Sequence, residues 1–178
     1  FTILELLVVI SIMAVIATLA TGAAVKAVKQ SRSKRVEITR KTLEMALMSY
    51  RAANNEWPFQ MSDLEKDSKD AGSYWAHGED NKKVFKPMYH GKAGESSTVY
   101  FDASALMTVE NGRREPLQVA LSLGRTDVGL GYVDPENANK FYYYCVQFKP
   151  LTDTVKVHIQ HNKSDHDCPA LNESEKQP

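Results

Sequence analysis

The first 25 residues, FTILELLVVISIMAVIATLATGAAV, form an apolar run in which Glu5 is the only charged side chain. A run of this length can cross the hydrocarbon core of a bilayer as a helix. A carboxylate at that depth costs about 2.5 kcal/mol or more on insertion scales, so it needs a partner. The run has no Lys, Arg or His, which leaves the Phe1 amine, from the same chain or from a neighbouring copy. The sequence therefore predicts a helix that lies in a membrane or against copies of itself, with Glu5 setting their register.

Two simpler interpretations of this run explain less of it. A secretory signal peptide would account for the small residues near its end, but such peptides begin with a basic segment and have a shorter apolar stretch. A single-pass membrane anchor accounts for the length and leaves Glu5 unexplained. Glu5 is therefore the residue that separates an anchor from an assembling subunit.

The stretch FTILELLVVISIMAVIATLA resembles the mature amino terminus of type IV pilins and type II secretion pseudopilins, of the class III type with an N-methylated Phe1. The resemblance rests on Phe1, on Glu5 and on the aliphatic residues that follow. It implies that a prepilin peptidase removes a leader, that the Phe1 amine is methylated, and that Glu5 pairs with the amine of an adjacent subunit. The implied partners are copies of the chain in a helical homopolymer, inner-membrane assembly machinery and, before assembly, the membrane.

This chain has Gly22 where the family often has a proline. Glycine is a poor helix former, by about 1 kcal/mol relative to alanine. Thr18 and Thr21 beside it can form hydrogen bonds to the local backbone. We expect residues 17–23 to be the weak point of the helix, a segment that stretches in the filament.

Charge is distributed unevenly along the chain. Residues 26–41 contain seven basic side chains against Glu37, a net charge of +6, whereas residues 42–178 carry −5. The basic stretch is interpreted first as a solvated helix face or as side chains that reach lipid headgroups. Attraction between the stem of one subunit and the head of another is the second interpretation. DNA binding is the third and least favoured, because a filament would cover the stretch.

Apolar residues at helical spacing continue to Tyr50 and predict one helix to about Ala53. Asn54-Asn55 and Trp57-Pro58 follow as stop signals. The predicted domains are therefore a transmembrane or filament-core helix, residues 1–53, and a head, residues 54–178. The segment YRAANNEWPFQMSDLEK is also similar to pseudopilins, which implies a short acidic helix at 62–66; the spacing of Ser62 and Glu65 predicts a capping box there.

The head is expected to contain one small antiparallel sheet, which gives an α+β fold of the type IV pilin kind. Residues 67–97 are rich in Lys, Asp, Gly and Asn and are interpreted as a long surface loop. Strands are predicted around Val99 and Phe101 and just before the turn pair Asn111-Gly112. The clearest pair, 140–148 and 154–159, is predicted to form a hairpin.

The two cysteines, Cys145 and Cys168, are expected to form one disulfide if the head lies outside the cytoplasm. Many type IV pilins close their carboxyl-terminal region with such a bridge, whereas the major pseudopilin usually does not. The bridge therefore favours a pilus subunit.

Metal and modification sites receive less support. The run HIQHNKSDHDC has no established zinc spacing, so no metal is expected there. Asp134, Glu136 and Asn137 are calcium candidates, as loops in some pseudopilins bind calcium, but their spacing is not that of a helix-loop-helix site. Asn162 and Asn172 fit the acceptor pattern for N-glycosylation.

No enzyme is predicted, because the sequence has no glycine-rich phosphate loop, no nucleophile elbow and no acid/base pair tied to a pocket; no cofactor is expected. The predicted function is that of a major pilin, a structural subunit of an extracellular filament that leaves the inner membrane for the cell surface. One alternative is a pseudopilin of a periplasmic type II secretion pseudopilus. The second is a membrane-anchored binding module, which would tolerate Glu5→Ala.

Overall fold

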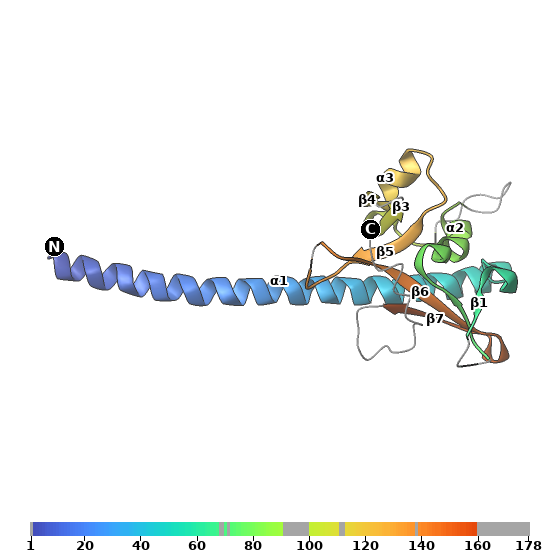
Figure 1. Cartoon of the computed structure of the whole chain (residues 1–178), viewed down its shortest axis with the longest axis horizontal. Helices are drawn as coiled ribbons and strands as arrows, with labels where there is room; N and C mark the ends of the chain where they lie inside the picture. Colours follow the sequence, from blue (N-terminus) through green and yellow to red (C-terminus); the bar gives the residue numbers. More distant parts are fainter. Residues whose placement is uncertain are drawn as a thin grey trace. The chain divides into compact units, whose positions relative to one another are not determined.

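A computed structural model describes residues 2–67, 70, 72–90, 100–110, 113–137 and 139–159 (Figure 1). Contacts divide the chain into two units, Phe1–Arg35 and Val36–Pro178. The elements, with η for 3-10 helices, are α1 (Ile3–Asn54), η1 (Met61–Asp63), β1 (Glu65–Lys66), β2 (Tyr74–Ala76), η2 (Gly78–Asp80), α2 (Asn81–His90), η3 (Ala103–Ala105), β3 (Met107–Glu110), β4 (Arg113–Pro116), α3 (Leu117–Ser122), β5 (Gly129–Val133), β6 (Phe141–Lys149), η4 (Pro150–Thr152) and β7 (Thr154–Ile159).

The long amino-terminal helix predicted from the apolar spacing is confirmed. Asn55, just past its last residue, has φ 55°, the left-handed conformation that asparagine tolerates at a helix end. The Asn54 side-chain amide donates to the Tyr50 carbonyl at 3.0 Å. The boundary between the two units lies within α1, between Arg35 and Val36, because Val36 and several later residues of the helix contribute to the core. The head is therefore the whole second unit, Val36–Pro178, and includes the end of α1.

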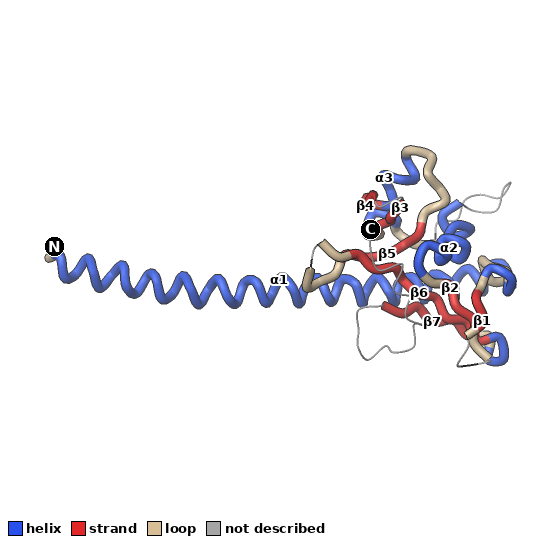
Figure 2. The backbone as a smooth tube through the Cα atoms, in the orientation of Figure 1, coloured by secondary structure: helices blue, strands red, loops and turns tan. Residues whose placement is uncertain are grey.

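The head is built on an antiparallel sheet in the order β1-β2-β6-β5-β3-β4, and β7 pairs with β6 (Figure 2). β6 is the central strand, since it pairs with β2, β5 and β7. Tyr144 lies opposite Ile159 and Lys149 opposite Thr154, which confirms the predicted hairpin. The fold is therefore α+β.

The core of the head lies between the sheet and two helices. The carboxyl-terminal half of α1 contributes Leu43 and Leu47, both fully buried, at the spacing of one helical face. α2 contributes Phe85, also fully buried. β6 and β7 contribute alternate side chains, as a strand with one face on a core requires, namely Tyr144, Val146, Phe148, Val155, Val157 and Ile159.

Side chains of α1 also hydrogen-bond the backbone of β7. Arg40 Nη1 donates to the Val157 carbonyl at 2.9 Å, and the Val157 N–H donates to Glu44 Oε2 at 3.4 Å. Arg40 is itself held by Glu37 at 2.7 Å and by Glu44 at 3.2 Å. The hydrogen bond from Arg40 is the main cause that lowers the pKa of Glu37. Arg40 therefore joins α1 to the sheet.

A second polar contact closes the end of α1 against the turn between β6 and β7. Trp57 Nε1 donates to Asp153 Oδ1 at 2.6 Å, and Arg51 Nη2 lies 3.1 Å from Asp153 Oδ2. The Trp57 hydrogen bond, with a further contribution from Arg51, holds the pKa of Asp153 below its ordinary value. Asp153 has φ 48°, so the turn is left-handed at the residue that makes these contacts.

Three local predictions for the head were wrong. The short helix predicted at 62–66 is a single 3-10 turn at 61–63, capped by the Gln60 N–H, which donates to Asp63 Oδ2 at 2.9 Å, and Glu65 lies in β1. The expected loop at 67–97 contains β2, η2 and α2. No strand is present at 100–102, the described part of the strand predicted around Val99 and Phe101.

Candidate assembly site

The apolar helix exposes its side chains in the isolated chain. In the Phe1–Arg35 unit, Ile3 is 88% and Leu4 74% exposed, and exposed aliphatic residues continue along the helix. Among the described residues, α1 is the one helix long and apolar enough to cross a membrane. Such a surface requires lipid or other protein to cover it.

Glu5 lies in a capping box at the start of α1. The Thr2 N–H donates to Glu5 Oε2 at 2.8 Å, and the Thr2 hydroxyl lies 3.3 Å from the same oxygen. In return, the Glu5 N–H donates to the Thr2 hydroxyl oxygen at 3.3 Å. These bonds satisfy backbone donors that a helix start leaves without partners. The T-x-x-E spacing is the sequence signal for this cap and gives Glu5 a partner other than the amine considered above.

The Glu5 carboxylate is only partly satisfied by this cap. Every hydrogen bond described for it involves Thr2 and reaches one oxygen, Oε2. Neither donor of Thr2 carries a charge, so the box does not neutralise the carboxylate. Phe1 lies outside the described residues, and the pairing of Glu5 with an amine stays a prediction.

The segment around Gly22 is helical in the single chain. α1 runs through it without interruption, and the Thr18 hydroxyl donates to the Val15 carbonyl at 2.8 Å. The Thr21 side chain lies outside the described parts of the helix. A Cβ on Gly22 would meet no atom within 4 Å, so packing within the chain does not require glycine here. Stretching of this segment in a filament stays a prediction.

The structure divides the basic stretch of residues 26–41 into two parts. Lys26, Lys29, Arg32, Lys34 and Arg35 are exposed in the first unit. Arg40 and Lys41 belong to the head and lie beside Glu37, at 2.7 Å and 3.9 Å. The exposed positive charge is therefore concentrated in residues 26–35.

The remaining candidates lie in the head. Cys145 is buried on β6 opposite His158, whereas Cys168, Asn162 and Asn172 lie outside the described residues, so the disulfide stays a prediction. Asp134 Oδ1 accepts from the Glu136 N–H at 2.8 Å, and Asn137 Oδ1 accepts from the Asn139 N–H at 3.0 Å. These calcium candidates thus support a turn. Within the described residues, no three His, Cys, Asp or Glu side chains are grouped to hold a metal.

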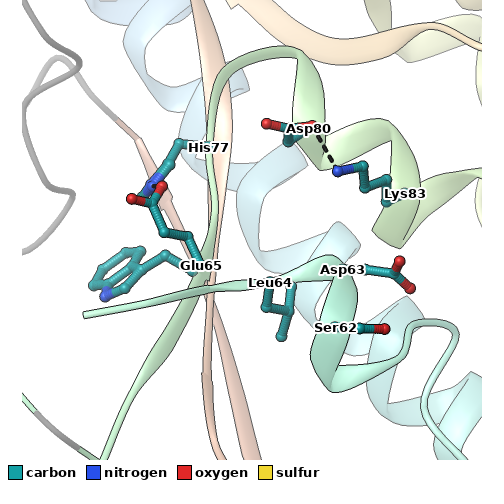
Figure 3. Close-up of a pocket in the computed structure, with 8 residues that line it drawn as sticks. Ser62, Asp63, Leu64, Glu65, His77, Asp80 and Lys83 are labelled. Carbon is teal, nitrogen blue, oxygen red and sulfur yellow. Dashed lines mark hydrogen bonds and ion pairs between the residues drawn. The ribbon is translucent and has the colours of Figure 1, made fainter. Parts of the chain in front are cut away.

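A small polar cleft of about 200 Å³ lies where β1 meets the start of α2 (Figure 3). Its ionisable side chains have partners within the head, and Asp63 accepts from the Gln60 N–H. Lys83 Nζ lies 2.9 Å from Asp80 Oδ1, and His77 Nε2 lies 3.0 Å from Glu65 Oε2. The cleft therefore lies between segments of the head that these contacts hold together.

The geometry thus places the sequence-predicted residues in separate groups. Glu5 and the exposed apolar side chains lie together at the start of α1, whereas Cys145 and the calcium candidates lie in the head. Comparison of the chain with protein-family models, with curated proteins and with solved structures finds no significant match.

Proposed function

We propose that this chain is the structural subunit of an extracellular, type IV pilus-like filament. The observation that carries the proposal is an exposed apolar helix whose only charged residue before position 26 is Glu5, near its start. Copies of the chain cover this surface with each other's helices. Their packing removes aliphatic side chains from water or exchanges lipid contacts for protein contacts.

The carboxylate supplies register to this packing. A general apolar surface would allow neighbouring helices to slide, since aliphatic side chains are interchangeable partners. One charge in the run restricts the alignment to the displacement that brings a cation to Glu5. The capping box with Thr2 leaves the negative charge in place, and the amine of a neighbouring subunit's Phe1 neutralises it.

The head is suited to display on the outside of such a filament. Its core residues, as far as the structure describes them, all lie within Val36–Pro178, where the second half of α1 packs on the sheet. We therefore expect the head to fold without the apolar segment. A pseudopilus subunit would use the same helix and the same carboxylate. The two kinds of filament differ in how far they extend.

The test is electron microscopy of cells that express the chain together with a type IV assembly system. The wild-type chain is expected to form long surface filaments that an antibody to the head decorates. Glu5→Ala is expected to remain in the membrane without filaments. The matched control is Ser11→Ala, which removes a hydroxyl that donates to the Leu7 carbonyl at 2.7 Å but no charge.

Each outcome has a distinct meaning. Filaments from wild type and Ser11→Ala, and none from Glu5→Ala, support the pilus subunit. Short structures confined to the periplasm support the pseudopilus. Filaments from all three chains would refute the role of Glu5, and a membrane-bound wild-type chain without filaments would favour the anchored binding module.

A further inference from the structure

We propose that the exposed cations that follow the apolar segment bind the phosphate headgroups of anionic lipids while the chain resides in the membrane. We name these residues the basic collar, which consists of Lys26, Lys29, Arg32, Lys34 and Arg35. The inference rests on the proposed function in one respect, that the chain is held in a membrane before it assembles. It adds the chemistry of the lipid that the unassembled subunit selects.

The collar has a single sign of charge. No carboxylate lies between Glu5 and Glu37 in the sequence, so the collar has no acidic neighbour one helical turn away on its amino-terminal side. All five of its side chains are exposed. By contrast, Arg40 lies within 3.2 Å of both Glu37 and Glu44. Arg40 is thus engaged within the head, whereas the collar side chains are exposed along the helix that precedes it.

The collar surrounds the helix. At about 100° per residue, its cations fall on all sides of α1, and no sector much wider than about 100° lacks one. A protein or a nucleic acid that approaches from one side would make more ion pairs with a stripe of cations along one face of the helix. Headgroups surround a membrane-spanning helix completely, so a ring of cations matches them.

The collar also begins at the depth where headgroups are found. From Ile3 to Lys26 the helix rises about 35 Å, slightly more than the roughly 30 Å hydrocarbon core of a bilayer. The collar then extends over about 14 Å of the helix. Lys and Arg side chains reach back along the helix toward the interface, which brings the later residues closer to the phosphates. A cluster of Lys and Arg side chains next to the membrane is attracted to a negatively charged lipid surface.

The test uses the full chain in phosphatidylcholine vesicles and measures which spin-labelled lipid contacts it. Electron spin resonance separates lipid next to the protein from free lipid, for spin-labelled phosphatidylglycerol and for spin-labelled phosphatidylcholine. The collar variant is Lys26→Gln/Lys29→Gln/Arg32→Gln. The matched control is Lys66→Gln/Lys140→Gln/Lys156→Gln, which removes three exposed charges from the head.

The wild-type chain is expected to favour phosphatidylglycerol at least threefold at low salt, and less in 1 M NaCl because salt screens the charges. The collar variant is expected to lose most of this preference and the control to keep it. Equal association of the two lipids with the wild-type chain, or a preference that survives in the collar variant, would overturn the proposal. Because the assay uses unassembled protein, lipid selectivity without filaments contradicts the proposed function alone, and filaments without selectivity contradict this inference alone.

Discussion

Glu5→Gln separates the two roles that the structure allows for Glu5. The glutamine oxygen can still accept the Thr2 N–H, which donates to Glu5 Oε2 at 2.8 Å, and the Thr2 hydroxyl, which lies 3.3 Å away. The variant therefore keeps most of the helix cap. It removes the negative charge that would pair with a neighbour's amine. Glu5→Ala removes both the cap and the charge.

The expected magnitudes follow from these contacts. Loss of the capping box in Glu5→Ala costs about 1 kcal/mol of helix stability, whereas Glu5→Gln costs a fraction of that. Removal of the carboxylate lowers the free energy of membrane insertion by up to about 2.5 kcal/mol in Glu5→Ala, the value for a charge at the centre of a span, which is at most roughly a 60-fold change in the equilibrium. Both variants are therefore expected to insert at least as well as the wild-type chain.

Two measurements complete the experiment. Alkaline extraction of membranes reports insertion, and immunoblotting of sheared filaments reports assembly. We expect both variants to insert fully and to lose at least tenfold in filament yield. Thr2→Ser, which retains the hydroxyl and the N–H, is expected to assemble like the wild-type chain. Wild-type filament yield from Glu5→Gln would refute the reasoning, because Glu5 would then be a helix cap and nothing more.

Three further predictions concern the head and the helix. Arg40→Ala is expected to lower the free energy of unfolding of the head by about 2 kcal/mol, because it removes bonds to Val157 and to two glutamates. Lys41→Ala, at an exposed pair of 3.9 Å, is expected to change it by less than about 0.5 kcal/mol; equal losses in urea denaturation would contradict this. Gly131→Ala is expected to lower the free energy of unfolding by about 3 kcal/mol or more, because the new Cβ would overlap the Tyr142 carbonyl and the Phe141 ring. Gly22→Ala meets no atom within 4 Å and is expected to stabilise the helix by up to about 1 kcal/mol. Circular dichroism during heating compares the two variants. Because the pKa of Asp153 is lowered in the folded head, its contribution to stability is present above about pH 4 and is lost as the pH falls through that lowered pKa. In an NMR titration, the Trp57 indole N–H resonance is expected to move in this acid range in the wild-type chain and not in Asp153→Asn.

Features with a local cause could be predicted from the sequence. The spacing of Leu43 and Leu47 indicates the buried face of α1, and Asn55 marks its end. The alternation of Val155, Val157 and Ile159 gives β7 with its observed bounds. The pairing of β6 with β7 follows because a short turn joins them.

Features set by distant contacts could not be predicted in this way. β5 contains Gly129 and Gly131, which suggest a turn, yet Gly131 is required because Phe141 and Tyr142 of the next strand lie against it. Asn81 is a residue type that is common in loops, but its buried amide donates to the carbonyls of Leu130 at 2.6 Å and of Tyr144 at 2.8 Å. The helical spacing of Val84, Phe85 and Met88 would have indicated α2, and the polar residues around them concealed it.

The same distinction applies to the candidate assembly site, which stays a prediction. The sequence identifies Glu5 because a carboxylate in an apolar run is a local anomaly. The division of the basic stretch needs the tertiary structure, since Arg40 is engaged with the head only once β7 lies beside α1.

The contact of Arg40 and Glu44 with Val157 has a consequence for aggregation through the sheet. β7 pairs on one side with β6, and a free edge on its other side would be a template for strand addition, a route to runaway aggregation. The side chains of α1 occupy the N–H and the carbonyl of Val157, so an incoming strand must first displace them. Edge-to-edge aggregation through the sheet is thereby disfavoured at this point.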